Sequence, residues 1–198
     1  MIDLRCEACG STQLKKRGSV MVCAFCGSRY VLDGNQNIQS KALTDAKLLL
    51  CYVEAEKHRQ AERYLDEFLM LTKALELDDN NPETLTKLGR CCRALGQNGK
   101  ALEYYNHAIE IDPSCGPAYA NIGTVYILTE RYAEAKAIYE KGLPYMDPSE
   151  SDYWTAFANY TLVIGKLGDL TRAETMIREA EEHGYPNCAA LRRLLGLS

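Results

Sequence analysis

The sequence predicts a mainly α-helical protein, in which a small N-terminal β module precedes an array of about three to four helical hairpins and a final helix. Two observations predict this architecture. Residues 1–33 alternate over short stretches and carry paired cysteines, whereas the residues from about Lys41 to Leu195 follow a helical period. Equivalent residues in the helical part also recur after 34 positions, which is a period of stacked helix pairs.

Composition limits the classes of protein that fit. The chain has 198 residues, of which 46% are hydrophobic and 25% charged, as in a soluble globular protein with a sizeable core. The formal net charge of −4 argues against a protein built mainly to neutralise a phosphate backbone. No stretch predicts a membrane span, and the N-terminus lacks the apolar core of a signal peptide. Nine cysteines, an odd number, fit reduced thiols, so we expect a cytoplasmic protein.

The first 33 residues are predicted to form the β module. Short strands are expected at Ser19–Cys23 and Arg29–Leu32, with glycines marking the turns around them. Residues 34–41 follow as a polar linker, because they show neither helical nor strand periodicity.

Four cysteines of the β module have the spacing of a metal site. Two C-x2-C pairs enclose thirteen residues, and their members are Cys6, Cys9, Cys23 and Cys26. Two residues between paired cysteines let a tight turn point both sulfurs at one metal, and four thiolates suit a closed tetrahedral Zn²⁺ site. We therefore expect one structural zinc ion, which supplies most of the folding free energy of so small a module.

Other uses of the cysteines fit less well. An iron site of the rubredoxin type, which also uses paired cysteines, is a less favoured alternative. A redox-active cysteine pair is expected within a βαβ unit, which the sequence does not show here. A catalytic zinc site is disfavoured because four thiolates leave no open position for water. Five further cysteines lie in or beside the predicted helices, where small core residues are the expected role. These are Cys51, Cys91, Cys92, Cys115 and Cys188.

The helical part divides into repeats. Small residues that let two helices approach, and large residues that fill the gaps between hairpins, return at fixed spacing. Leu85, Leu88, Gly89, Ala101, Tyr105 and Ala108 recur 34 positions later as Tyr119, Ile122, Gly123, Ala135, Tyr139 and Gly142. Ala135 and Gly142 recur after 38 positions as Ala173 and Ala180, which places four extra residues near 144–151. The predicted repeats are therefore 82–115, 116–149 and 154–187.

The two ends of the array are less regular. Residues 42–81 contain no glycine or proline and are predicted to be an atypical first repeat. This block is expected to be either two elongated helices that meet near His58–Ala61 or one continuous helix. Residues 188–198 are predicted to be an amphipathic helix that closes the stack.

These patterns resemble two known families. Residues 1–33 resemble a zinc ribbon through CEACG and CAFCG, and residues 82–187 resemble tetratricopeptide repeats, most clearly over 82–149. The second resemblance implies a right-handed α-solenoid whose concave surface holds an extended peptide or helix of a partner. By matching positions, the first helix of each hairpin supplies the groove residues Thr86, Arg90, Arg93, Ala120, Asn121, Thr124, Ala158, Asn159 and Leu162.

The family resemblance also bears on the kind of partner. Some members bind chaperone C-termini through a clamp of lysine, asparagine and arginine, and Thr86 and Ala120 depart from that clamp. Arg90 and Arg93 favour an acidic peptide instead.

The sequence therefore predicts a non-enzymatic scaffold or adaptor that binds a protein or peptide, with no membrane contact and no small-molecule substrate. No catalytic motif appears, so an enzyme with a site in the groove is the least favoured interpretation. The main alternative is a nucleic-acid-associated regulator. In that case the β module contacts DNA or RNA through Lys15, Lys16, Arg17 and Arg29.

Overall fold

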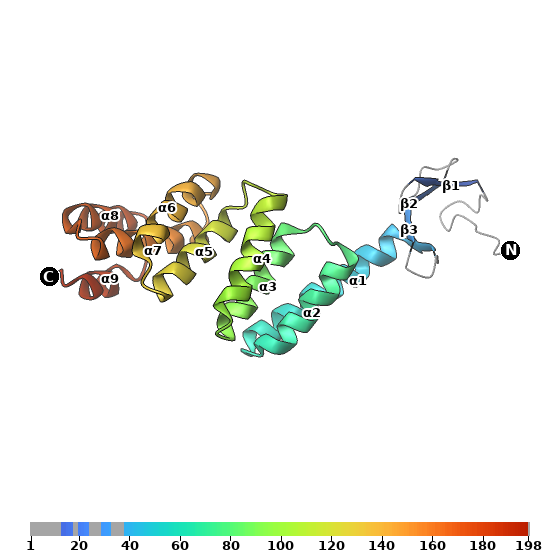
Figure 1. Cartoon of the computed structure of the whole chain (residues 1–198), viewed down its shortest axis with the longest axis horizontal. Coiled ribbons are helices and arrows are strands. Elements are labelled where there is room, and N and C mark those ends of the chain that lie inside the picture. Colours follow the sequence, from blue (N-terminus) through green and yellow to red (C-terminus); the bar gives the residue numbers. More distant parts are fainter. Residues whose placement is uncertain (1–12, 18–19, 24–28, 33–37, 198) are drawn as a thin grey trace.

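The computed structural model describes residues 13–17, 20–23, 29–32 and 38–197 (Figure 1). These residues form four short strands, nine α-helices and one 3-10 helix. The helices follow one another as antiparallel pairs along an elongated array (Figure 1). The strands lie at the N-terminal end of the first helix. The described helices include none that is long and apolar enough to cross a bilayer.

The strands form one antiparallel sheet in the order β1-β2-β3-β4. Each strand pairs with its neighbour in sequence, and β2 and β3 coincide with the two segments that the sequence predicts as strands. The strands are β1 Leu14–Arg17, β2 Val20–Cys23, β3 Arg29–Leu32 and β4 Ile38–Ser40.

The linker predicted over residues 34–41 is shorter in the structure. Ile38–Ser40 forms β4 and pairs with β3, and helix α1 begins at Lys41 directly after it. Three residues with one apolar side chain are too few to show strand periodicity, so only the pairing with β3 reveals this strand. The sheet therefore continues into the helical array without a loop between β4 and α1.

The helices form four hairpins and a terminal helix. Residues 42–81 contain two helices joined by a turn at 61–63, and the last helix packs against α7 and α8. The helices are α1 Lys41–Gln60, α2 Tyr64–Leu77, α3 Pro82–Ala94, α4 Asn98–Ile111, α5 Gly116–Leu128, α6 Tyr132–Gly142, α7 Ser151–Lys166, α8 Leu170–Glu182 and α9 Cys188–Leu195, with the 3-10 helix η1 at Leu143–Tyr145.

Local sequence signals set several helix boundaries. The Asn81 side chain accepts a hydrogen bond from the Thr84 amide at 2.9 Å, and Pro82 occupies the first turn of α3, where its missing N–H costs nothing. Gly96 and Gly168 follow α3 and α7 with φ of 74° and 97°. Glycine adopts this left-handed conformation without steric cost, so both helices end there and the chain reverses into the next helix.

Two tyrosines fix the spacing of the central hairpins. Tyr105 on α4 packs against Gly89 on α3, and Tyr139 on α6 packs against Gly123 on α5. A Cβ atom at position 123 would lie only 2.5 Å from the Tyr139 ring. The first helix of each of these hairpins therefore needs glycine at this position, because the partner ring occupies the space of a side chain.

The first hairpin uses a different set of residues at the equivalent positions. Ala55 stands where the central hairpins have glycine, and Leu71 stands where they have tyrosine; both are buried. The smaller leucine side chain leaves room for the methyl group of the alanine. Glu67 occupies the position of Ala101, and it is also buried. A buried carboxylate at this position requires a counter-charge, and Arg90 of the second hairpin supplies it.

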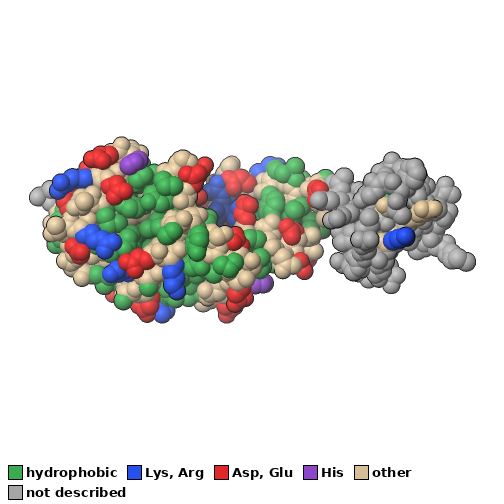
Figure 2. Space-filling view, turned by 90° about the horizontal axis from the view of Figure 1, so that it is seen from above, with side chains coloured by type: hydrophobic (Ala, Val, Ile, Leu, Met, Phe, Trp, Pro, Cys, Tyr) green, Lys and Arg blue, Asp and Glu red, His purple; other side chains and the backbone are tan. Residues whose placement is uncertain are grey.

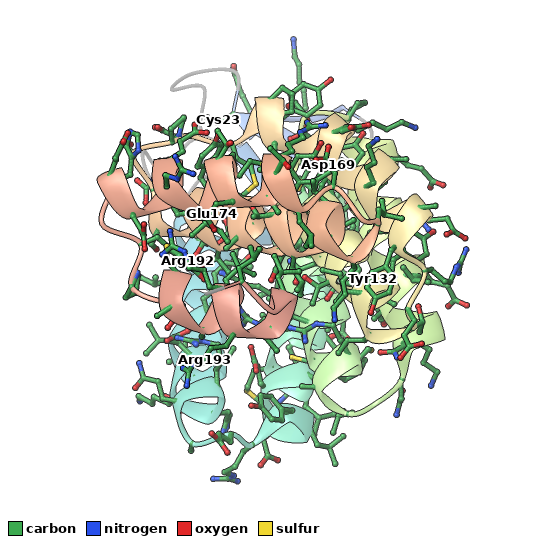
Figure 3. All side chains as sticks on the ribbon, turned by 90° about the vertical axis from the view of Figure 1, so that its left-hand side faces the viewer. Cys23, Tyr132, Asp169, Glu174, Arg192 and Arg193 are labelled. Atoms are coloured by element: carbon green, nitrogen blue, oxygen red, sulfur yellow. The ribbon has the colours of Figure 1, made fainter. Side chains whose placement is uncertain are left out.

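The C-terminal end of the array is closed by α9. Arg192 on α9 forms ion pairs with Glu174 and Glu181 of α8, and Figure 3 shows Arg192 and Glu174 on the facing sides of these helices. Leu195 packs so closely on Gly165 of α7 that a Cβ atom there would lie 2.5 Å from the leucine. The last hairpin is therefore shielded from water on the side that has no further repeat.

We predict that Gly123→Ala lowers the free energy of unfolding by about 1–3 kcal/mol, because the new methyl group displaces the Tyr139 ring. Gly99→Ala is the matched control on α4, since nothing lies within 4 Å of a Cβ atom there. It should be neutral or stabilising by up to about 1 kcal/mol. Urea denaturation measures both, and equal effects of the two substitutions would contradict the packing of the ring over the glycine.

Candidate functional site

Two adjoining hollows open along the face formed by the first helices of the last three hairpins. One, of about 220 Å³, lies between α3, α5 and α7, and the other, of about 490 Å³, extends toward the beginning of α3. Arg90, Pro117, Asn121 and Asp152 line both hollows, so the two form one continuous groove. We call this the concave groove, defined by the residues that line the two hollows.

The structure places most of the sequence-predicted groove residues here. Thr86, Arg90, Asn121, Thr124 and Asn159 line the groove, together with Ala120.

Three other predicted residues do not line the groove, and Arg93 of α3 is the first of them. Leu162 packs against the hydrophobic core of the last two hairpins, and Ala158 is buried with it. Because α7 begins at Ser151, three residues before the predicted repeat, its groove face carries Asp152, Thr155 and Asn159. Because four residues are inserted before this helix, the repeat period alone does not predict where α7 begins.

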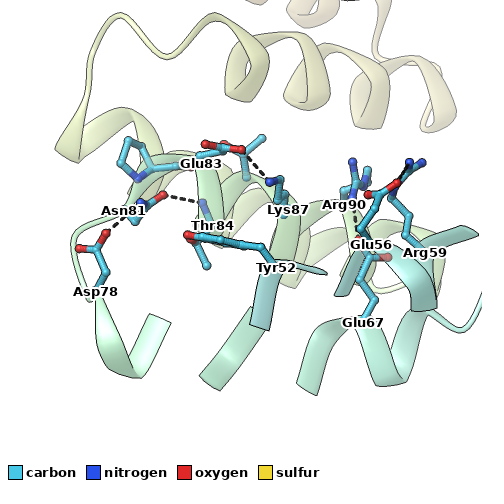
Figure 4. A network of polar contacts seen from close by, with 12 residues as sticks. Tyr52, Glu56, Arg59, Glu67, Asp78, Asn81, Glu83, Thr84, Lys87 and Arg90 are labelled. Carbon is cyan, nitrogen blue, oxygen red and sulfur yellow. Dashed lines mark hydrogen bonds and ion pairs between the residues drawn. The ribbon is translucent and has the colours of Figure 1, made fainter. Parts of the chain in front are cut away.

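A partly buried ion pair joins the first hairpin to the second beside the groove (Figure 4). The Arg90 Nη2 atom donates a hydrogen bond of 2.6 Å to Oε1 of Glu67, whose residue is only 1% exposed. The second oxygen, Oε2, has no hydrogen-bond partner among the described residues. Arg90 is therefore engaged by Glu67, and it is less available to a ligand than its position in the sequence suggests.

The neighbouring charges are also paired. Arg59 hydrogen-bonds Glu56, which lowers the pKa of Glu56 to about 2. Lys87 forms an ion pair of 2.6 Å with Glu83, and its Nζ lies 4.9 Å from the centre of the Tyr52 ring.

The contribution of α1 to this region could not be predicted from the repeat period. The Tyr52 hydroxyl lies 2.5 Å from Oγ1 of Thr84, so α1 is tied to α3 by a hydrogen bond (Figure 4). A third hollow of about 420 Å³ lies between α1, α2 and α3, with Tyr52, Glu67 and Arg90 among its lining residues. It continues the same face of the array toward the N-terminus.

Arg93 lies one helical turn beyond Gly89 on α3. Burial raises the pKa of the adjacent Tyr105 to about 12, and both the positive charge of Arg93 and a side-chain hydrogen bond with it oppose that rise. Burial also raises the pKa of Tyr139 to about 12, and the side chains of Thr124 and Asn159 oppose it. Both tyrosines are therefore neutral hydrogen-bond donors at physiological pH.

Charges of both signs are interspersed on the array. On the face that Figure 2 shows, acidic and basic side chains lie beside one another between exposed hydrophobic side chains. Such a surface differs from the continuous basic stripe that is typical of nucleic-acid-binding proteins.

The predicted zinc site falls mostly outside the described residues. Cys6, Cys9 and Cys26 lie there, whereas Cys23 ends β2 opposite Leu14 of β1 and is 1% exposed. The residues that the structure describes contain no group of three His, Cys, Asp or Glu side chains able to hold a metal. A buried thiol at a strand end fits a ligand position, but it is one of four.

The predicted nucleic-acid contacts lie in the same sheet. Lys15, Lys16 and Arg17 belong to β1 and Arg29 begins β3, so β2 separates them.

Three of the five cysteines in or beside the helices have core positions. Cys91, Cys92 and Cys188 are buried, and Cys51 and Cys115 are partly buried. Burial raises the pKa of Cys91 to about 12, with Glu67 adding to the rise. A thiol of this kind stays protonated and unreactive at neutral pH.

Four antiparallel hairpins, a groove on the face of their first helices and a closing helix define an α-solenoid of helix pairs. Two sequence models of the tetratricopeptide repeat match the chain, over residues 42–114 and 93–160. The chain is therefore a tetratricopeptide repeat protein, and its array is a protein–protein interaction domain.

The curated proteins that this chain resembles contain similar repeats but are much longer. The chain is 32% identical over 96 residues to small glutamine-rich tetratricopeptide repeat-containing protein 2 of Mycosarcoma maydis, covering 48% of this chain and 27% of the relative. It is 31% identical over 109 residues to the protein O-mannosyl-transferase TMTC1 of Homo sapiens, covering 54% and 12%. The chain thus spans about a quarter or less of these relatives.

Solved structures show the same fold. YrrB, described as a tetratricopeptide repeat protein with an unusual peptide-binding site, is 28% identical with a TM-score of 0.55, over 64% of this chain and 62% of YrrB. The Sgt2 repeat domain of Aspergillus fumigatus is 24% identical with a TM-score of 0.56, over 64% and 82%.

We predict that Arg90→Ala destabilises the array by up to about 3 kcal/mol, because it leaves the Glu67 carboxylate buried without a counter-charge. Adding Glu67→Ala should restore stability, since alanine is the residue that the next hairpin carries at this position. Lys87→Ala is the matched control, and loss of its more exposed pair should cost about 1 kcal/mol or less. Thermal and urea unfolding report all three; a double variant no more stable than Arg90→Ala alone would contradict the role of the pair.

Proposed function

We propose that this protein is a non-enzymatic adaptor whose concave groove binds an extended segment of a partner protein. The observation that carries the proposal is the line of amide and hydroxyl side chains along the groove, supplied by successive first helices. Asn121 of α5 and Asn159 and Thr155 of α7 are its main members. The Asn121 amide donates to the Pro117 carbonyl at 2.8 Å, which leaves its own carbonyl oxygen as an acceptor.

An extended peptide presents a main-chain N–H and C=O at nearly every residue, and side-chain amides can satisfy both kinds of group. A rigid array of packed hairpins suits such binding, since little conformational freedom is lost on the side of the array. YrrB, which shares the fold and is described as having an unusual peptide-binding site, adds support. The groove residues named above include no nucleophile held by a base, which favours binding over catalysis.

We expect Asn121→Ala combined with Asn159→Ala to weaken partner binding about tenfold, through loss of two hydrogen bonds to the partner's main chain. Asn106→Ala is the matched control, because Asn106 is exposed on α4, the second helix of its hairpin. The measurement is a quantitative pull-down from nuclease-treated extract with each tagged protein, read by mass spectrometry.

Partners retained equally by the wild type and the groove variant would argue against the groove as the binding site. Material that is lost only on nuclease treatment would favour the nucleic-acid alternative, in which the basic residues of the sheet make the contact.

We further propose that residues 1–33 form a zinc ribbon held by Cys6, Cys9, Cys23 and Cys26. The paired spacing of the cysteines and the burial of Cys23 at the end of β2 support the proposal. Zinc would act as a structural cross-link of the module, without a catalytic role.

Cys23→Ser should abolish stoichiometric zinc, measured by inductively coupled plasma mass spectrometry, because serine does not replace a thiolate ligand. Cys115→Ser serves as the control, since Cys115 lies in the helical array between α4 and α5. The far-UV circular dichroism of the helices should survive both substitutions. Purified wild-type protein without zinc, or zinc unchanged in Cys23→Ser, would refute the proposal.

A further inference from the structure

The segment between α6 and α7, which contains the four inserted residues, forms part of the groove wall. It includes η1, whose last residue, Tyr145, lines the larger hollow of the groove. The segment packs tightly on the start of α5, since a Cβ atom at Gly116 would lie 2.5 Å from Cγ of Met146. The Tyr145 ring stacks on the ring of Tyr119 with centroids 6.1 Å apart, yet the residue remains 53% exposed. The insertion therefore holds an aromatic ring in place while leaving it open to a ligand.

Two aspartates line the same hollow as this ring. Asp112 directly follows the last residue of α4, and Asp152 lies in the first turn of α7. Oδ1 of Asp112 accepts hydrogen bonds from the hydroxyl and the main-chain amide of Ser114, at 2.6 and 2.9 Å, and both bonds lower the pKa of this carboxyl. Neither aspartate forms an ion pair with any residue that the structure describes.

The cations that line the groove already have counter-charges. Lys87 forms an ion pair with Glu83, and Arg90 forms one with Glu67 (Figure 4). Arg93 lines neither hollow of the groove. The two aspartates are therefore the charged groove residues that lack a counter-charge among the described residues. The sequence alone favours an acidic peptide, because it shows the two arginines without the carboxylates that surround them.

We propose that Asp112, Asp152 and the Tyr145 ring form a subsite that receives an arginine side chain of the bound segment. This inference rests on the peptide-binding function proposed above. Carboxylates provide the counter-charge and accept charge-assisted hydrogen bonds, and an open aromatic face attracts a cation. A guanidinium suits these groups better than an ammonium, because it stacks on aromatic rings and donates two parallel hydrogen bonds to a carboxylate. The partner is therefore expected to present a basic segment to the groove.

The subsite can be tested with peptides selected from a random phage-displayed library on the full chain. A selected peptide that binds the groove, as judged by its loss of affinity for Asn121→Ala with Asn159→Ala, is labelled for fluorescence anisotropy. We expect Asp112→Asn and Asp152→Asn each to weaken binding about tenfold, the usual effect of losing a charge-assisted pair. Tyr145→Leu should weaken binding several-fold, because it removes the ring that the cation contacts.

Two matched variants serve as controls. Tyr145→Phe keeps the aromatic ring, so its affinity should equal that of the wild type. Glu110→Gln removes one negative charge at an exposed position of α4 outside the groove, and it should also leave the affinity unchanged. Thermal unfolding of every variant separates a loss of binding from a loss of the fold.

Peptide variants identify the cation. Replacing the basic residue of the peptide by glutamine should weaken wild-type binding and have no further effect in Asp112→Asn with Asp152→Asn. Replacing arginine by lysine should weaken wild-type binding less than glutamine does. Should the groove-binding peptides be acidic, or tolerate both aspartate variants, the subsite is refuted and the proposed function stands. If no groove-binding peptide emerges, both fall.

Discussion

The packing of a tyrosine ring over a glycine sets the geometry on which the rest of the array depends. Tyr105 and Tyr139 are almost fully buried, and each occupies the space that a side chain on the facing helix would fill. The two helices of a hairpin can therefore approach closely, and their first helices line up on one face. The Tyr139 hydroxyl reaches Thr124, a residue of the groove itself. One packing contact thus supports the fold and brings polar atoms to the groove.

The first hairpin shows what happens when this arrangement changes. Ala55 and Leu71 replace the glycine and tyrosine, and Glu67 replaces a small residue. The buried carboxylate of Glu67 forms an ion pair with Arg90 of the next hairpin. Arg90 lines the groove, and this ion pair also gives it a structural role. Arg93, three residues away, lacks such a partner among the described residues. Two arginines that look equivalent in the sequence therefore have different physical roles.

The repeat period predicts the hairpins, the final helix and most of the groove residues, because the small and aromatic positions recur whenever two helices must approach. Three features escape it for physical reasons. Strands β1 and β4 have one apolar residue each and show no periodicity. The insertion before α7 shifts the residues that reach the groove, and the pairing of Arg90 with Glu67 joins residues 23 positions apart. The proposed zinc ligands rest mainly on cysteine spacing, and of the four only Cys23 lies among the described residues.

Whether the partner lies in the concave groove can be measured by site-specific photocrosslinking. A photoreactive residue is placed at Thr155, which lines the groove on α7, or at Thr175, which is exposed on α8. The two threonines are matched, since each hydroxyl donates to a main-chain carbonyl four residues earlier. If the groove holds the partner, illumination in native extract captures a specific protein from position 155 and little from position 175. Capture of the same protein mainly from position 175 would contradict a groove-bound partner.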